Sequence, residues 1–170
     1  MVMSSILLKN VDYVLTQNSS RDVLRNSSVF IEDGLIIEVG NPRVEAEFTI
    51  SGRGKVLMPG LINCHTHSSM SLLRGYADDM KLDRWLKEKI WPAESRLTPY
   101  HCYVGALLAC LEMIKFGVTC FNDMYIFTHE IAKAVEESGL RCFLGEVIFD
   151  WNKDEKIPYF KKFINLTSLV

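Results

Sequence analysis

The chain has 170 residues, of which 48% are hydrophobic and 24% are charged, as in a soluble globular protein with a substantial core. Its formal net charge is −2 and no block of basic residues occurs, which argues against nucleic acid or an anionic membrane surface as a partner. The longest apolar runs, such as 104–111, are too short to cross a bilayer, and the N-terminus lacks the pattern of a signal peptide.

The cysteines indicate a reducing compartment. The chain has five cysteines, an odd number, and no two of them form a C-x-x-C pair. This argues against a zinc ribbon, a redox pair or a disulfide framework. The cysteines are Cys64, Cys102, Cys110, Cys120 and Cys142. We therefore expect reduced thiols in a cytoplasmic protein.

The N-terminal region, residues 1–55, has the pattern of β-strands. Residues 6–16 are rich in β-branched side chains, which favour strands. Residues 28–40 are typical of a hairpin, because an Asp-Gly pair supplies the positive φ angles of a tight turn. One more short strand is expected within 47–60, and no helical period appears before about residue 70.

A pattern of alternating strands and helices begins at residue 56. The apolar run 56–63 predicts a strand buried on both faces. After a loop-and-helix segment, the next elements are a helix capped by Thr98, a strand at 118–124, a helix at 128–139, a strand at 140–149 and a helix-like stretch at 159–164. This order indicates a parallel α/β architecture, in which the chemistry lies at the carboxyl ends of the strands.

Two histidines follow the run 56–63, at such a carboxyl end. Residues i and i+2 of a strand point the same way, so His65 and His67 would present two imidazoles to one metal ion, while Thr66 faces the other side. An H-x-H pair is also compatible with an ordinary polar strand end. Its place at the mouth of a predicted parallel sheet favours the metal.

The sequence VLMPGLINCHTH, residues 56–67, resembles the first barrel strand of the amidohydrolase superfamily, in which the H-x-H pair carries two metal ligands. The resemblance continues through residues 67–94 and 117–125. Residues 7–40 are similar to that family's N-terminal portion of a small β-sandwich. Within the superfamily, the chain is most similar to the deaminases of adenine nucleosides, namely methylthioadenosine, S-adenosylhomocysteine and 5′-deoxyadenosine.

The resemblance implies an α/β fold made of two parts. Residues 56–170 would form about the first three βα units of an incomplete (β/α)₈ TIM barrel, and residues 1–55 the N-terminal part of a β-sandwich. It further implies one divalent metal, zinc or iron, that is held by His65 and His67 and activates a water for attack on the ring carbon bearing the amino group. The substrate would be a small-molecule nucleoside, and the full-length parent a homo-oligomer.

Two glutamates are candidate substrate-binding residues. The resemblance assigns Glu94 to the ribose hydroxyls, since each carboxylate oxygen can accept one O–H; the alternative is a solvated helix residue. Glu146 stands where relatives that handle S-adenosylhomocysteine tend to carry an arginine, and an acidic residue would repel that substrate's carboxylate. We therefore expect a preference for a neutral 5′ end, as in 5′-deoxyadenosine, methylthioadenosine or adenosine.

Other polar side chains near the histidine pair are expected to be structural. Asp123 follows the second strand, at a position that the family does not use for a metal ligand. Cys64 neighbours His65 but faces away from it, so it is expected to pack rather than to ligate. His101 and His129 lie near predicted helix N-termini and are expected to be structural or exposed.

The expected ligand set is incomplete. A catalytic metal needs at least three protein ligands and an open position, and the family supplies the others, with an H-x-x-E glutamate, from later strands that have no match here. We therefore expect no catalytic residue within this chain, which would be a truncated N-terminal part and inactive alone. Two alternatives remain, a chlorohydrolase or a guanine- or cytosine-type deaminase of the same superfamily, and a non-catalytic fragment that acts as an assembly module.

Overall fold

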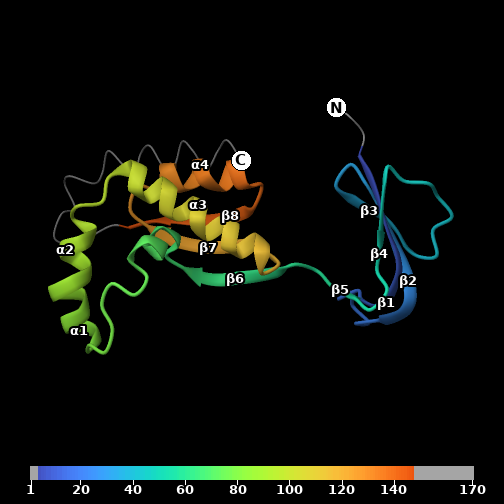
Figure 1. Ribbon diagram of the computed structural model, residues 1–170, viewed down its shortest axis with the longest axis horizontal. Helices are drawn as coiled ribbons and strands as arrows, with labels where there is room; N and C mark the ends of the chain where they lie inside the picture. The colour runs from blue at the N-terminus through green and yellow to red at the C-terminus, as the bar shows by residue number, and fades with distance from the viewer. Residues whose placement is uncertain (1–3, 148–170) are drawn as a thin grey trace. The chain divides into compact units, whose positions relative to one another are not determined.

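The computed structural model describes residues 4–147 (Figure 1). The chain divides into two compact units between Pro59 and Gly60. All five cysteines lie in the described part, and all five are free thiols. The helix-like stretch expected at 159–164 lies outside the described residues.

The first unit is a five-stranded sheet with the order β3-β2-β1-β4 and with β5 paired to β1 (Figure 1). Its strands are β1 (Ser5–Leu15), β2 (Val23–Glu32), β3 (Leu35–Gly40), β4 (Phe48–Ser51) and β5 (Val56–Leu57). β2 is antiparallel to β1 and β3, whereas β4 and β5 run parallel to β1. The expected hairpin is confirmed, because Asp33 and Gly34 join β2 to β3 with φ angles of 50° and 78°, as a type I′ turn requires.

The core of the first unit is small. It consists of Val11, Val14 and Val29, and the side chains packed against it are Leu8, Leu24, Ile31 and Leu57. Leu35 and Ile36 of β3 are about two-thirds exposed, which is what an apolar strand shows when nothing covers it. That this sheet belongs to a β-sandwich stays a prediction.

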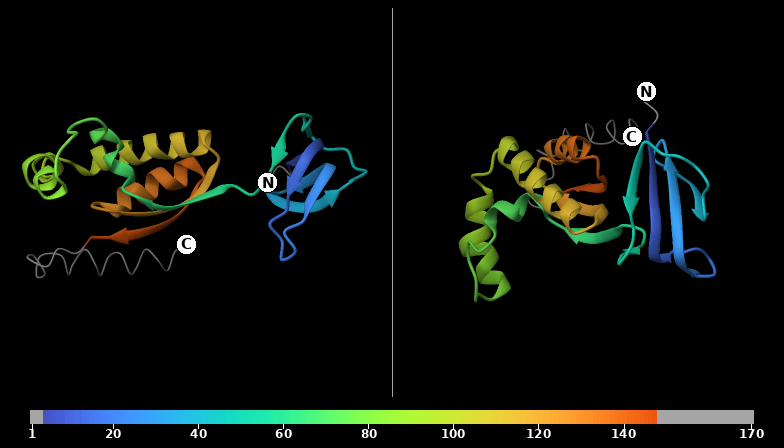
Figure 2. Two further views of the ribbon diagram at one scale, coloured as in Figure 1. Left: turned by 90° about the horizontal axis from the view of Figure 1, so that it is seen from below. Right: turned by 45° about the vertical axis from the view of Figure 1, so that its right-hand side comes forward.

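The second unit has a parallel three-stranded sheet in the order β6-β7-β8. The strands are β6 (Leu61–Thr66), β7 (Val118–Tyr125) and β8 (Arg141–Glu146), and the connecting helices are α3 (Pro99–Lys115) and α4 (Thr128–Ser138). Figure 2 shows both helices on the same side of the sheet. The expected alternation of strands and helices is confirmed, and it places the carboxyl ends of all three strands at one edge of the sheet.

A long connection joins β6 to α3 at that edge. It contains the 3₁₀ helix η1 (Ser68–Leu73), the α-helical turn α1 (Leu82–Trp85), the π-helical segment η2 (Leu86–Ile90) and α2 (Trp91–Glu94). α3 then begins as predicted, with Thr98 as N-cap and Pro99 in the first turn. Within residues 4–147 no single helix is long and apolar enough to cross a membrane; Leu82–Glu94 and Pro99–Lys115 reach that length and composition only as a pair bent by 113°.

The expectation of one strand over 56–63, buried on both faces, is wrong. Val56 and Leu57 pair with β1, and the strand of the parallel sheet starts only at Leu61. Pro59 lacks an N–H for a ladder, and a Cβ on Gly60 would lie 2.1 Å from a methyl group of Thr119, so only glycine fits there. Leu61 is 50% exposed, because the helices cover only one face of this sheet.

Small residues form the face of α3 that packs on the sheet. They are Cys102, Gly105, Ala106, Ala109 and Cys110, all buried. Of these, Cys102, Ala106 and Cys110 share a core with Phe121 and Tyr125 of β7 and Ile131 of α4, whereas Gly105 lies against Ser69 of η1. The larger side chains that recur at helical spacing line a groove of about 390 Å³ on the helix surface, and of them only Leu107 also packs against this core within the described residues; they are Val104, Leu107, Leu108, Leu111 and Ile114. The helical period therefore identified the helix but not its buried face.

Candidate metal and substrate site

The two histidines lie side by side at the carboxyl end of β6. The ring centroids of His65 and His67 are 5.0 Å apart, with planes inclined by 77°. Nδ1 of His67 is 2.7 Å from the backbone carbonyl oxygen of Met124. Since a carbonyl oxygen only accepts, Nδ1 carries the proton, and in the neutral imidazole Nε2 then keeps its lone pair, the arrangement usual for a metal-ligating histidine.

The carboxylate of Asp123 fixes the backbone directly after His67. Asp123 is 1% exposed and accepts hydrogen bonds from Ser68 N at 3.0 Å, from Ser68 Oγ and from Met124 N at 2.9 Å. Burial raises the pKa of the Asp123 carboxyl, and its bonds to Ser68 and Met124 partly oppose that rise. In these contacts the side chain is a support for the loop after His67, which agrees with the structural role expected for it.

Tyr125, the last residue of β7, holds the candidate sugar ligand. Its hydroxyl donates to Oε1 of Glu94 at 2.8 Å, and its ring centroid lies 6.4 Å from that of His67. Tyr125 is 5% exposed, and burial, followed by the Glu94 carboxylate, raises its pKa far above the usual range. The phenol therefore keeps its proton and remains a donor to the half-buried carboxylate.

Serine hydroxyls attach η1 to α3. Ser69 Oγ donates to the carbonyl oxygen of Cys102 at 2.9 Å, and Ser71 Oγ donates to that of Gly105 at 2.7 Å. Gly105 permits this approach, since a Cβ there would lie 2.5 Å from the carbonyl oxygen of Ser69. The segment that follows the histidine pair is thus held against the helix.

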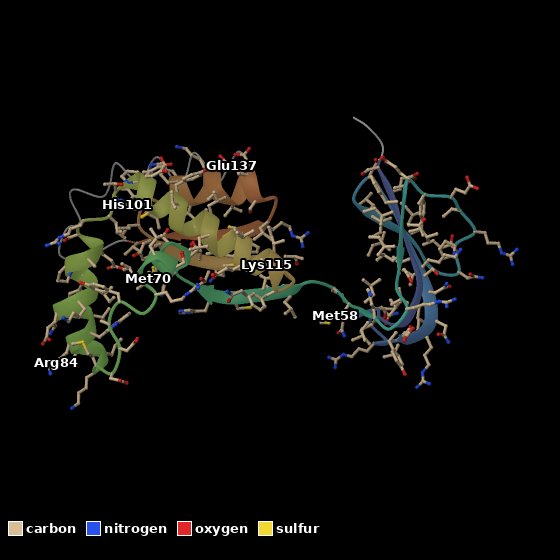
Figure 3. All side chains as sticks on the ribbon, in the orientation of Figure 1. Met58, Met70, Arg84, His101, Lys115 and Glu137 are labelled. Atoms are coloured by element: carbon tan, nitrogen blue, oxygen red, sulfur yellow. The ribbon has the colours of Figure 1, made fainter. Side chains whose placement is uncertain are left out.

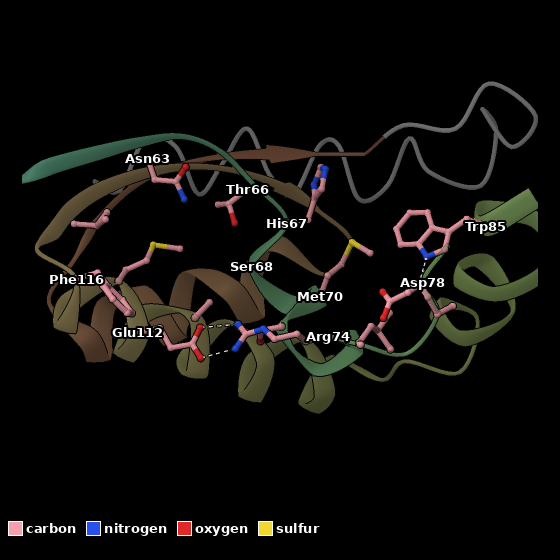
Figure 4. A pocket seen from close by; sticks show the side chains of 17 residues that line it. Asn63, Thr66, His67, Ser68, Met70, Arg74, Asp78, Trp85, Glu112 and Phe116 are labelled. Atoms are coloured by element: carbon pink, nitrogen blue, oxygen red, sulfur yellow. Dashed lines mark hydrogen bonds and ion pairs between the residues drawn. The ribbon is translucent and has the colours of Figure 1, made fainter. Parts of the chain in front are cut away.

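A cavity of about 590 Å³ opens beside the pair, lined by residues of β6, η1, α3 and the chain between them (Figure 4). Arg74 and Glu112 form a bidentate ion pair across it, at 2.8 and 2.6 Å. In Figure 4 the ring of His67 and the side chain of Thr66 point to opposite sides of the chain. The cavity reaches His67 but not His65, Glu94 or Glu146, so it adjoins the candidate residues without enclosing them.

Glu146 ends β8 and is engaged by its own surroundings. Its Oε2 accepts from Thr128 Oγ1 at 2.6 Å and its Oε1 from Val147 N at 3.3 Å. These bonds tie the carboxylate to the start of α4. The structure brings Glu94 to the histidine pair through Tyr125, whereas the contacts of Glu146 are with α4 and the end of its own strand.

Three other residues were assigned from sequence. His101 is exposed at the start of α3 (Figure 3) and forms a capping box with Thr98, which confirms its structural role. His129 lies at the start of α4, 3.3 Å from a carboxylate oxygen of Glu130. The expectation that Cys64 packs is wrong within the described residues, because its side chain is exposed on a strand that the helices cover on one face only.

The sequence did not reveal Tyr125 or the carbonyl of Met124 as partners of the site. One signal was available for Tyr125: it shares a strand face with Phe121 and Asp123 by alternation, and it ends the strand next to the one that carries the histidines. Its partner Glu94 lies 31 residues away in sequence, and a backbone carbonyl carries no sequence signal at all.

The histidine pair fits part of a metal site. Imidazole nitrogen suits zinc and iron, and the free Nε2 of His67 is oriented by the bond from its Nδ1 to Met124. Residues 4–147 contain no group of three or more His, Cys, Asp or Glu side chains that could hold a metal ion. Within that range the histidine pair could therefore offer two of the at least three protein ligands that a catalytic metal needs.

Residues 56–166 match the amidohydrolase family. The chain belongs to this family. It is 50% identical over 155 residues to the 5′-deoxyadenosine deaminase of Methanosarcina acetivorans, and this match covers 90% of this chain and 36% of that protein. It is 47% identical over 157 residues to the 5-methylthioadenosine/S-adenosylhomocysteine deaminase of Halothermothrix orenii, again with 36% of the relative covered. The chain thus spans about a third of the length of these curated relatives.

Solved amidohydrolase structures share the fold. An adenosine deaminase from Xanthomonas campestris with bound zinc superimposes with a TM-score of 0.86 at 33% identity, over 94% of this chain and 39% of that one. The atrazine chlorohydrolase of Arthrobacter aurescens, complexed with zinc, gives a TM-score of 0.76 at 20% identity, over 88% and 37%. The second likeness supports the mixed α/β fold alone.

Proposed function

We propose that this chain is the N-terminal part of a metal-dependent hydrolase that removes the amino group from an adenine nucleoside. The candidate substrates are 5′-deoxyadenosine, methylthioadenosine, adenosine and S-adenosylhomocysteine. The observation that carries the proposal is the adjacent pair His65 and His67, with Nε2 of His67 kept free by the carbonyl of Met124. The chain shares about half of its aligned residues with deaminases of this substrate class, and this similarity supports the choice of substrate.

Each candidate residue has a distinct role in this proposal. His65 and His67 would hold one divalent metal, zinc or else iron, which when bound supplies activation of a water molecule at neutral pH. Glu94 would accept hydrogen bonds from the sugar hydroxyls. The remaining ligands and the proton shuttle would come from later strands of a (β/α)₈ barrel, of which β6, β7 and β8 are the first three, preceded by part of a β-sandwich.

We further propose that Glu146 disfavours a substrate with a charged 5′ end. It lies at the carboxyl end of β8, where a carboxylate would repel the amino-acid carboxylate of S-adenosylhomocysteine. The expected result is a kcat/KM for 5′-deoxyadenosine at least about tenfold above that for S-adenosylhomocysteine, a ratio that corresponds to roughly 1.4 kcal/mol. Glu146→Gln should narrow the ratio, and equal values in the unaltered enzyme would contradict this role.

A non-catalytic role is the second candidate, because residues 4–147 contain no group of three or more side chains that could hold a metal ion. In that case the chain would act as an assembly module. A chlorohydrolase, or a deaminase of guanine or cytosine, has weaker support, since the likeness to the atrazine enzyme is one of fold alone.

A hybrid protein tests the proposal. Residues 1–147 would be joined to the remaining portion of the Methanosarcina acetivorans relative, loaded with zinc and assayed for release of ammonia and chloride. We expect ammonia from adenine nucleosides, and its loss in the His65→Asn hybrid. Faster turnover of guanine, cytosine or atrazine would favour the alternative enzymes, and a zinc-loaded, folded hybrid without any turnover would favour the assembly module.

A further inference from the structure

A buried tyrosine links the two halves of the candidate site. The side chain of Tyr125 packs in the core with Cys102 and Ile131, and its hydroxyl reaches out of that core to Oε1 of Glu94 at 2.8 Å. A ring enclosed in this way cannot change rotamer without disturbing its neighbours. Its hydroxyl is therefore a fixed point for a flexible carboxylate.

We propose that Tyr125 is a positioning residue, which holds the Glu94 carboxylate ready for a vicinal diol of the substrate. This inference rests on the sugar-binding role proposed above for Glu94. A carboxylate has about four lone-pair positions, so the bond from Tyr125 occupies one and leaves Oε2 and part of Oε1 for two sugar hydroxyls. Fixing the side chain in advance removes the entropy cost of ordering it when substrate binds.

The same strand end also orients the metal side of the site. The carbonyl of Met124 accepts from Nδ1 of His67, and the next residue along the chain, Tyr125, donates to Glu94. Two successive residues of β7 thus set the relative positions of a metal ligand and the sugar ligand. Tyr125 therefore controls where the nucleoside is held relative to the reaction centre, without itself touching the reacting atoms.

The second unit offers a matched control for this bond. Tyr103 of α3 donates its hydroxyl to Oε2 of Glu137 on α4 at 2.6 Å, so it makes the same kind of tyrosine–glutamate contact on the helix side of the sheet. Tyr103→Phe removes the same chemical group as Tyr125→Phe. The two variants remove the same hydroxyl from a tyrosine–glutamate bond, although the bond of Tyr103 is exposed and that of Tyr125 is partly buried, and only Glu94 belongs to the candidate site.

The experiment compares Tyr125→Phe, Tyr103→Phe and Glu94→Gln in the zinc-loaded hybrid, with adenosine and with 2′,3′-dideoxyadenosine, which lacks the diol. Tyr125→Phe should raise KM for adenosine on the order of tenfold, as loss of a hydrogen bond to a charged group predicts, with kcat nearly unchanged. Its KM for the dideoxy compound should stay the same, and Tyr103→Phe should alter neither substrate. In the double variant, Tyr125→Phe should raise KM for adenosine little beyond the value of Glu94→Gln alone.

Each result separates this inference from the proposed function. If Glu94→Gln affects both substrates equally, the sugar-binding role of Glu94 is wrong and the positioning role fails with it. If Glu94→Gln raises KM for adenosine but not for the dideoxy compound, and Tyr125→Phe does not, the positioning role alone is wrong. A crystal structure of the Tyr125→Phe chain decides the case without turnover, because an unmoved, equally ordered Glu94 carboxylate would overturn the inference.

Discussion

Asp123 makes three hydrogen bonds from a side chain that is 1% exposed. Asp123→Ala would leave the buried donors of Ser68 without an acceptor, which costs about 2–4 kcal/mol of the free energy of unfolding. Urea unfolding followed by tryptophan fluorescence measures this cost, because all three tryptophans lie after residue 59. The exposed Asp78→Ala is the control and should change stability by less than about 0.5 kcal/mol; equal effects of the two variants would contradict the supporting role of Asp123.

The thiols differ sharply in environment, and their reactivity should follow. Burial raises the pKa of Cys102 to about 11 and that of Cys142 to about 12, so at pH 8 about one Cys102 thiol in a thousand is ionised. Since the thiolate is the nucleophile, iodoacetamide should modify exposed Cys64 well before either of them, as mass spectrometry of the labelled chain can show. Labelling in urea, where all five should react alike, is the control, and equally fast labelling of Cys102 in the folded chain would contradict the burial.

Sequence predicts single residues well where the pattern is local. The pairing of His65 with His67 followed from strand alternation over three positions, and the helix cap at Thr98 from its neighbours. The bond between Tyr125 and Glu94 depends on how a strand and a helix 31 residues apart are placed, which no local pattern encodes. The same is true of the Met124 carbonyl that orients His67.

Gly105 decides how closely α3 approaches η1. In an exposed helix interior, Gly→Ala stabilises by about 1 kcal/mol, but here the added Cβ would lie 2.5 Å from the carbonyl oxygen of Ser69 and 3.0 Å from its Cα. Backbone atoms cannot move aside cheaply, so Gly105→Ala should destabilise the second unit by about 1–3 kcal/mol. Urea unfolding measures this change, with the exposed Leu111→Ala of the same helix as the control. A stabilised Gly105→Ala chain would contradict the prediction, because it would show that the backbone of η1 shifts to accept the added Cβ.

Elements were predicted more reliably than their surroundings. Hydrophobic period and capping residues placed both hairpin strands, α3, α4 and the strands between them. They failed at residues 56–63, where the chain passes from one sheet to another around Pro59 and Gly60, because an apolar run does not show which sheet it joins. They also left the buried face of α3 unidentified, since close packing onto η1 and the sheet selects small residues there rather than large apolar ones.

The second unit is open when taken as a whole. Its helices cover one face of the sheet. On the opposite face, the side chains of Ile62, Met124 and Phe143 are 66%, 45% and 73% exposed. Parallel sheets of this class are normally covered on both faces, so in the barrel proposed above these side chains would lie on the face that further strands enclose. In that proposal the histidine pair lies at the edge of this face, where the remaining metal ligands would be placed.

The 170-residue chain alone should not deaminate adenine nucleosides. Its two other histidines, His101 and His129, begin α3 and α4 and make local contacts there, so they are not available to complete a site with His65 and His67. Two imidazoles fall short of the three protein ligands that a catalytic zinc needs, and the isolated chain should lose added zinc on dialysis, whereas the hybrid should retain about one ion per chain. Metal analysis after dialysis and ammonia release from adenosine measure the two properties. Mixing the chain with the separately expressed remainder of the relative is the positive control for assembly, and turnover by the zinc-treated chain on its own would show that it completes the site by means not seen in residues 4–147.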